Sequence, residues 1–186
     1  DFDELQLEVN AILDNLSFGI ESDKFEEALQ SVGEFLGFIS QRPDKEIRKG
    51  PDNLWCGVDD QYLIFECKNE VDDNRGEINK HEAGQMNSHC AWFEEEYGTN
   101  ARVQRFLIIP TKNLSYYGNF THDVKIIRKG KLRDLRKNIK GFVRELSPFV
   151  LSDISDESLQ RFLKTHKLEL MDLKQEYSEP YYHKTK

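Results

Sequence analysis

The sequence has no run of about 18 apolar residues, which excludes a helix that spans a membrane. Its N-terminus lacks a basic flank followed by a short apolar stretch, so no secretory signal is expected. Cysteine is scarce: Cys56, Cys67 and Cys90 have no CxxC spacing, which argues against a disulfide framework and a zinc knuckle. A reducing, cytoplasmic setting is therefore expected.

The chain also lacks the excess of positive charge that marks an obvious nucleic-acid binder, since its net charge is −8. That charge lies entirely in residues 1–27, where Lys24 is the single base. The acids of this segment are Asp1, Asp3, Glu4, Glu8, Asp14, Glu21, Asp23, Glu26 and Glu27. Acids and bases balance in residues 28–186, so the net charge does not exclude a nucleic-acid partner.

A length of 186 residues, of which 32% are charged and 38% hydrophobic, fits one globular domain with a small appendage. The chain begins with Asp1 and not with Met, which favours a segment of a longer polypeptide. We expect an acidic N-terminal helix in residues 1–20 that could serve as a docking element. Residues 21–150 would form the core, and residues 151–186 a helical extension with a loose tail from Tyr177.

Apolar periodicity predicts the order of the helices and strands. Helices are expected over 2–16, over 22–39 with Ser22 or Asp23 as N-cap, over about 18 residues up to Tyr97, over 132–147 and around 159–163. Strands are expected over 53–58, 61–68, 105–110 and 124–127, the first two joined as a hairpin across Asp59-Asp60. Residues 41–50 are expected to be an exposed loop. This order predicts a mixed α/β sheet flanked by helices.

Two carboxylates and one amine are expected to meet at the end of the hairpin. Asp52 follows Gly50-Pro51 at the start of the first strand, and the second strand ends in Glu66-Cys67-Lys68. Alternation places Glu66 and Lys68 on one face, and the hairpin returns that face beside Asp52. Carboxylates suit hard cations such as Mg²⁺ or Mn²⁺, which can polarise a phosphoryl oxygen and activate water.

Pro51-Asp52 followed by Glu66-Cys67-Lys68 resembles the PD-(D/E)xK motif of the restriction-endonuclease-like nucleases. Phe25-Glu26, eleven residues before Gly37-Phe38, is similar to the opening helix of Mrr-type members. Gln85 resembles the helix residue that supports the catalytic Lys in many members. The resemblance covers residues 22–112 and implies a restriction-endonuclease-like α/β core.

This resemblance implies metal-dependent hydrolysis of nucleic acid, with DNA as the expected substrate and RNA left open. Asp52 and Glu66 would hold Mg²⁺ (or Mn²⁺), with the backbone carbonyl of Cys67 as a further ligand and Glu26 bound directly or through water. Glu27 is the fallback for Glu26. Lys68 would position or deprotonate the attacking water, and Gln85 would orient Lys68.

Four of these residues also have a simpler interpretation. Glu66 and Lys68 could form a cross-strand ion pair, although the apolar Leu63–Phe65 run indicates an interior strand. Glu26 could be a helix N-terminal acid, and Gln85 a polar surface residue. His89 lies one turn from Gln85 and could face a phosphate, but a solvated surface histidine is the preferred interpretation.

Basic residues indicate where a phosphate backbone could bind. Arg42, Lys45, Arg48 and Lys49 precede Asp52, and Arg133, Lys137 and Lys140, continued by Arg144, form one stripe on a predicted helix. A solvated helix face is the alternative for this stripe. The expected partners are DNA and a helicase or other domain of a longer helicase-linked or restriction/defence protein, with a dimer left open and no membrane. The competing hypotheses are a catalytically inactive nuclease-fold module that binds nucleic acid or a partner, and a purely structural domain.

Overall fold

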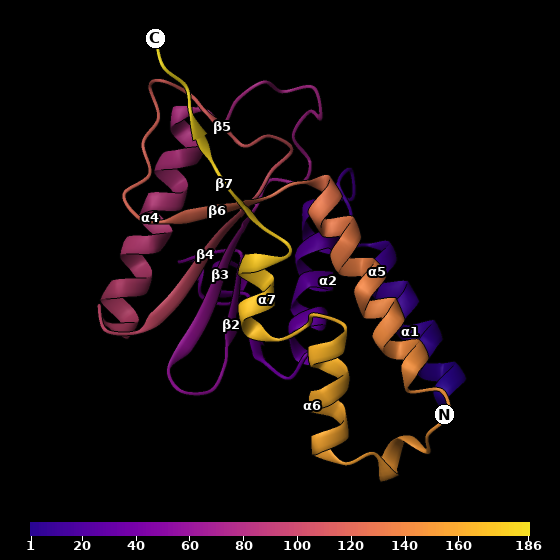
Figure 1. Cartoon of the computed structure of the whole chain (residues 1–186). Coiled ribbons are helices and arrows are strands. Elements are labelled where there is room, and N and C mark those ends of the chain that lie inside the picture. The colour runs from indigo at the N-terminus through magenta and orange to yellow at the C-terminus, as the bar shows by residue number, and fades with distance from the viewer.

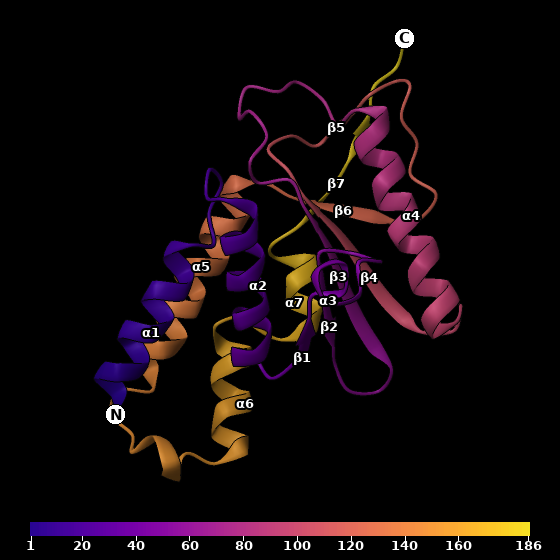
Figure 2. The ribbon, with the colours of Figure 1, turned by 180° about the vertical axis from the view of Figure 1, so that it is seen from behind.

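Six strands form a mixed sheet between two layers of helices (Figures 1 and 2). The structure, a computed structural model, describes residues 1–186. The helices are α1 (Phe2–Asp14), α2 (Ser22–Phe35), α3 (Pro43–Ile47), α4 (Lys80–Tyr97), α5 (Lys129–Glu145), α6 (Asp156–Thr165) and α7 (Leu170–Gln175), with a 3-10 turn η1 (Leu151–Asp153). The strands are β1 (Ile39–Gln41), β2 (Asn53–Cys56), β3 (Gln61–Cys67), β4 (Arg102–Ile108), β5 (Asn113–Leu114), β6 (Val124–Ile127), β7 (Glu179–Pro180) and β8 (Tyr182–His183). None of the helices combines the length and apolar character needed to cross a bilayer.

The large sheet has the strand order β1-β2-β3-β4-β6-β7. Strands β1, β2 and β3 are antiparallel neighbours, β3, β4 and β6 run parallel, and β7 returns antiparallel to β6. The predicted hairpin is confirmed: Asp59 and Asp60 adopt φ values of 55° and 56°, which suit the tight turn between two twisted strands. The predicted mixed α/β sheet flanked by helices is therefore confirmed.

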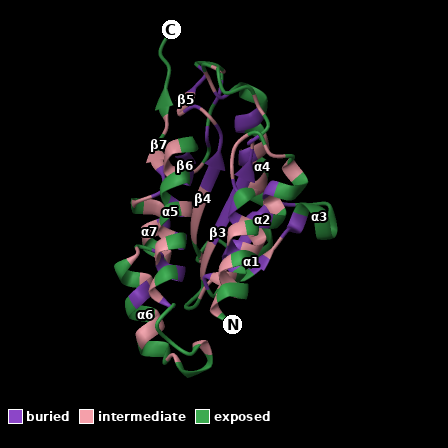
Figure 3. Cartoon of the chain, turned by 90° about the vertical axis from the view of Figure 1, so that its right-hand side faces the viewer, coloured by how far each residue is buried: buried purple, intermediate pink, exposed green.

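Alternate residues of the central strands belong to two hydrophobic clusters, one on each face of the sheet. Figure 3 shows the buried stretches of β3 and β4 lying between the helices. Phe65 belongs to the larger cluster, formed with α1, α2, α5 and the C-terminal helices, whereas Ile64 belongs to the cluster beneath α4. Leu13 and Phe162 lie in the same larger cluster as Phe65. The segments 1–20 and 151–186 therefore share the core of residues 21–150.

The region after α2 differs from the sequence-based prediction. The helix begins at Ser22 after N-cap Glu21 and ends at Phe35, so neither predicted N-cap is used and Ile39 lies in β1. Gly37 adopts φ +96° and the amide of Phe38 donates to the carbonyl of Gly33, a C-terminal motif that stops the helix. Residues 41–50 are not simply an exposed loop, because they contain α3.

The prediction of a loose tail from Tyr177 is wrong. Tyr177 is 1% exposed, and its hydroxyl donates to the carbonyl of Lys167 at 2.8 Å. Strand β7 then pairs with β6, and β8 pairs with β5. Two-residue strands carry almost no periodicity, so their pairing depends on sheet edges that other parts of the chain provide.

Candidate active site

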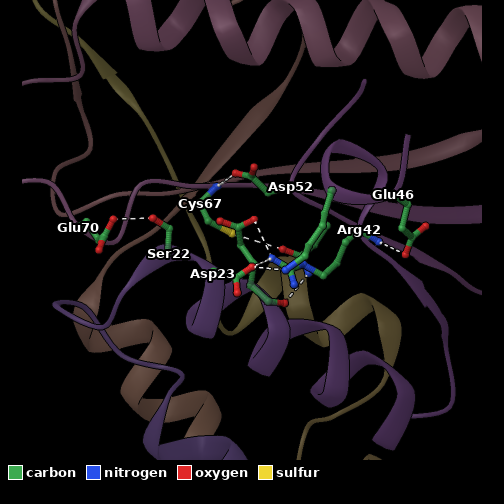
Figure 4. A network of polar contacts seen from close by, with 10 residues as sticks. Ser22, Asp23, Arg42, Glu46, Asp52, Cys67 and Glu70 are labelled. Atoms are coloured by element: carbon green, nitrogen blue, oxygen red, sulfur yellow. Dashed lines mark hydrogen bonds and ion pairs between the residues drawn. The ribbon is translucent and has the colours of Figure 1, made fainter. Parts of the chain in front are cut away.

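The hairpin brings the Asp52 carboxyl group against the end of β3. Asn53 pairs with Phe65 in the antiparallel register, so Asp52 lies across from Glu66. The Oδ2 atom of Asp52 accepts a hydrogen bond from the backbone amide of Cys67 at 2.7 Å (Figure 4). The strand alternation therefore produces the juxtaposition that the sequence predicts.

Burial and the neighbouring Glu66 carboxyl group change the pKa of Asp52. Burial raises the pKa of Asp52 from 3.8 to about 9, with further contributions from the charge and hydrogen bond of Glu66 and from the charge of Glu26. The amide of Cys67 opposes this rise. Glu66 itself is 4% exposed. At neutral pH the pair therefore favours either a shared proton or a nearby cation.

Glu26 lies on α2, which packs on the face of the sheet opposite α4, and its charge acts on Asp52. Burial raises its pKa, the hydrogen bond from Arg42 lowers it, and the charge of Glu66 raises it. The backbone carbonyl of Glu26 accepts a hydrogen bond from Asn53 Nδ2 at 2.9 Å, which fixes α2 to the start of β2. Glu26 is therefore close enough for its charge to act on Asp52, while its side chain is paired with Arg42.

Arg42 is not available for a nucleic acid, which corrects its predicted role. Its side chain is 6% exposed and its Nη2 donates to Asp23 at 2.9 Å and to Glu26 at 3.4 Å (Figure 4). Asp23 also accepts from Lys45 at 2.6 Å, and hydrogen bonds from Lys45 and then Arg42 lower the pKa of Asp23. The sequence offers no local signal for this pairing, because 19 residues separate Arg42 from Asp23.

The other three basic residues before Asp52 remain at the surface. Lys45, Arg48 and Lys49 are exposed. Lys45 and Arg48 border a hollow of about 630 Å³ that reaches Glu26. Its full lining is Ser22, Asp23, Glu26, Arg42, Asp44, Lys45 and Arg48. The hollow has mixed charge. Because they are exposed, Lys45, Arg48 and Lys49 remain candidates for phosphate contacts.

His89 is the site residue that the preferred interpretation missed. Its Nδ1 atom contacts Glu66 Oε2, so it is not a solvated surface histidine. Helix α4 sets this position: Asn79 and Glu82 form a reciprocal capping box that fixes where the helix begins. Only the packing of α4 against β3 brings His89 to Glu66, 23 residues earlier in the chain.

Lys68 and Gln85 both lie near this end of β3, but no hydrogen bond joins them. The backbone amide of Lys68 donates to the carbonyl of Ile108 at 2.7 Å, while its side chain takes part in none of the ion pairs of the molecule. The amide oxygen of Gln85 is buried and accepts no hydrogen bond. Lys68 is anchored through its backbone, and its ammonium is free for other contacts.

The segments on either side of the site are held by tertiary contacts. Gly50 adopts φ +87°, and a Cβ added there would lie 2.9 Å from the ring of Trp92 on α4. The loop before Asp52 therefore packs directly on this indole. After Lys68, the side chain of Asn69 donates to the carbonyl of Ile20 at 2.6 Å, which ties the end of β3 to the loop between α1 and α2.

The predicted basic stripe lies on the exposed side of α5. Arg133, Lys137 and Lys140 are exposed, and Leu135 and Ile139 of the same helix are buried. A groove of about 300 Å³ runs along this face and is lined only by Arg133, Arg136, Lys137, Lys140 and Arg144. Arg136 is committed to the fold, since its Nη1 donates to the carbonyl of Leu16 at 2.6 Å.

The donor set of the site consists of oxygens. No group of three or more His, Cys, Asp or Glu side chains is arranged as a metal site. Asp52 and Glu66 supply two carboxylates, which is enough for Mg²⁺ because this ion keeps several waters and accepts few protein ligands. The raised pKa of Asp52 indicates a deficit of positive charge at this pair. The residues present therefore fit a hard divalent cation.

Comparison of the chain with models of protein families, with curated proteins and with solved structures finds no match. The geometry of the site joins Asp52, Glu66 and His89 in direct contacts, brings Glu26 close, and leaves the ammonium of Lys68 unpaired.

Proposed function

We propose that the chain is a metal-dependent nuclease that hydrolyses phosphodiester bonds, with DNA as its substrate. The observation that carries the proposal is the close approach of the half-buried carboxyl group of Asp52 to the buried carboxyl group of Glu66, beside an unpaired Lys68. A structural ion pair would join Lys68 to an acid, and here it does not. We also propose that the central sheet and its helices form a restriction-endonuclease-like core.

Asp52 and Glu66 would hold Mg²⁺ or Mn²⁺, with the carbonyl of Cys67 as a third oxygen ligand and Glu26 acting through water. The cation supplies charge that polarises a phosphate and lowers the pKa of water. His89 keeps one oxygen of Glu66 in place, so it is a positioning residue. Lys68 would orient the attacking water and stabilise negative charge that develops on the phosphate. The free amide oxygen of Gln85 offers this ammonium an acceptor.

The basic face of α5, defined by Arg133, Lys137, Lys140 and Arg144, suits a phosphate backbone. Lys137→Glu combined with Lys140→Glu is expected to weaken DNA binding similarly for all sequences and to flatten its salt dependence. Phosphate contacts release counterions and read no bases, which is the reason. Unchanged affinity across a salt titration would mean that this face is only solvated.

Cleavage of a supercoiled plasmid with and without Mg²⁺ tests the proposal. We expect the parent chain to nick DNA only with the cation, and Glu66→Gln to abolish nicking while retaining the fold by circular dichroism. Lys68→Met keeps the aliphatic stem and should bind Mg²⁺ as well as the parent in a calorimetric titration, yet lose most of the turnover. A fully active Lys68→Met protein would remove Lys68 from the mechanism, and nicking by Glu66→Gln would refute the ligand assignment.

An inactive nuclease-fold module is the second candidate. The partnering of Glu26 by Arg42 favours it, because this ion pair already neutralises one expected metal-site acid. Metal and DNA binding without cleavage in the same experiments would support this alternative.

A further inference from the structure

Three tyrosine rings are exposed where the C-terminal strand β8 meets β5. Tyr116, Tyr117 and Tyr182 have exposed fractions of 47%, 71% and 56%. The rings of Tyr116 and Tyr117 lie 5.2 Å apart between centroids in an edge-to-face arrangement. The Tyr116–Tyr117 ring pair, together with Tyr182 on the strand paired with β5, offers exposed aromatic surface in one region, which suits a binding surface. We call Tyr116, Tyr117 and Tyr182 the tyrosine platform.

The backbone beneath the tyrosine platform is held firmly. Asn113 and Tyr182 are partners in the parallel β5–β8 pair, and the amide of Tyr182 donates to the carbonyl of Lys112 at 2.8 Å. The amide of Tyr117 donates to Ser115 Oγ at 3.2 Å. The side chain of Leu114, between the two exposed segments, is completely buried. The rings therefore project from an ordered support and would lose little conformational entropy on binding.

Lysine side chains lie beside part of the tyrosine platform. The ammonium of Lys186 lies 5.8 Å from the centroid of the Tyr116 ring. Lys184 forms an ion pair with Glu77 at 3.0 Å, and Lys112 lies at the start of β5. Aromatic faces beside cations match a ligand that has planar rings and a negatively charged backbone. An apolar protein partner would not explain the lysines.

The tyrosine platform lies at the same edge of the sheet as the candidate active site. Strands β3 and β4 are parallel, Cys67 pairs with Ile108, and β5 begins a few residues beyond that pair. Figure 1 shows β5 and the C-terminal strand at the end of the sheet where α4 begins. A strand of nucleic acid bound on these rings would therefore lie on the side of the molecule that carries Glu66 and Lys68.

We propose that Tyr116, Tyr117 and Tyr182 bind unpaired bases by stacking, so that this surface takes a single-stranded part of the nucleic-acid substrate. A duplex hides the faces of its bases, whereas a single strand exposes them to aromatic side chains. Lys186 and Lys112 contribute attraction to the phosphates. The inference rests on the proposed function, because it names the form of the substrate. Binding can nevertheless be measured without cleavage.

Fluorescence anisotropy of a labelled oligothymidylate of about 15 nucleotides, and of a duplex of equal length, tests this inference in the presence of a chelator. Tyr117→Ala combined with Tyr182→Ala is expected to weaken binding of the single strand about tenfold and to leave duplex binding unchanged. The matched control replaces both residues by Phe, which keeps the ring faces and should preserve affinity. Circular dichroism verifies that each variant is folded.

Three results would overturn the inference: a parent chain that does not bind the single strand, an alanine double variant that binds it as tightly as the parent, or an equal loss for duplex and single strand. Failure of the proposed function gives a different result. A parent chain that binds the single strand through the tyrosines but never cleaves with Mg²⁺ would leave the tyrosine platform intact and refute the nuclease.

Discussion

Replacing Asp52 by Asn should stabilise the fold while it abolishes cleavage. Asp52 carries a pKa of about 9 in the folded chain instead of 3.8, so the folded state retains a proton that the unfolded state loses. Stability at this position therefore falls as the pH rises from about 4 to about 9. An asparagine has the shape of the protonated acid, can still accept from the amide of Cys67, and can donate to Glu66.

The size of the effect follows from the interval between the unfolded pKa and the working pH. At pH 7 this interval is roughly three pH units, and each unit corresponds to about 1.36 kcal/mol, so the upper limit of the gain is about 4 kcal/mol. The gain should vanish near pH 4, where both states of the parent hold the proton. The stability gain of Asp52→Asn should increase as the pH rises from about 4 to 7.

Urea unfolding from about pH 4 to pH 8, with a chelator present, measures this dependence. Glu95→Gln is the control, because it removes one negative charge from an exposed site on α4. Saturating Mg²⁺, at about 100 times its dissociation constant, should add about 2.7 kcal/mol to the parent and far less to Asp52→Asn. An Asp52→Asn protein no more stable than its parent at neutral pH would refute the reasoning about this carboxyl pair.

Three further substitutions test the surroundings of the site. His89→Phe should lower nicking at least about tenfold with the fold intact, since Glu66 loses its partner, whereas the exposed His81→Ala should be neutral; equal activities would contradict the role of His89. Gly50→Ala should cost about 2 kcal/mol of unfolding free energy because of its positive φ and the clash with the indole, whereas Gly84→Ala, in open space on α4, should stabilise by about 0.5 kcal/mol; thermal melts decide this. Arg42→Gln should destabilise by about 2 kcal/mol in urea unfolding, chiefly because the largely buried Glu26 loses its cation while Asp23 is half-exposed, and an unchanged free energy of unfolding would show that the ion pair is dispensable.

The order of the main helices and strands and the Asp52–Glu66 pair of the candidate site were predictable because they depend on local patterns. Alternation along 61–68 and the Asp59-Asp60 turn fix which face carries Glu66, and the same register places Asp52 opposite it. The 18 residues of α4 were predictable from apolar spacing and end at Tyr97 as expected. These features depend only on residues within one hairpin or one helix.

The pairing of charges could not be obtained in this way. Arg42 had the pattern of a surface base, yet α2 and α3 pack so that two acids enclose it. The sequence favoured a solvated His89, but the packing of α4 against β3 brings His89 to Glu66. Buried ionisable groups take the partner that lies nearest in space, and sequence separation carries no information about that distance.

The sequence by itself determined the strand and helix periods, the hairpin and the Asp52–Glu66 pair, because each arises from repeats of two or 3.6 residues. The tertiary structure alone decided that the C-terminal segment forms β7 and β8 and that Tyr182 lies on the strand paired with β5, the strand that leads to Tyr116 and Tyr117. The physical reason is that a two-residue strand has no stability of its own and forms only where a distant part of the chain offers an unpaired edge.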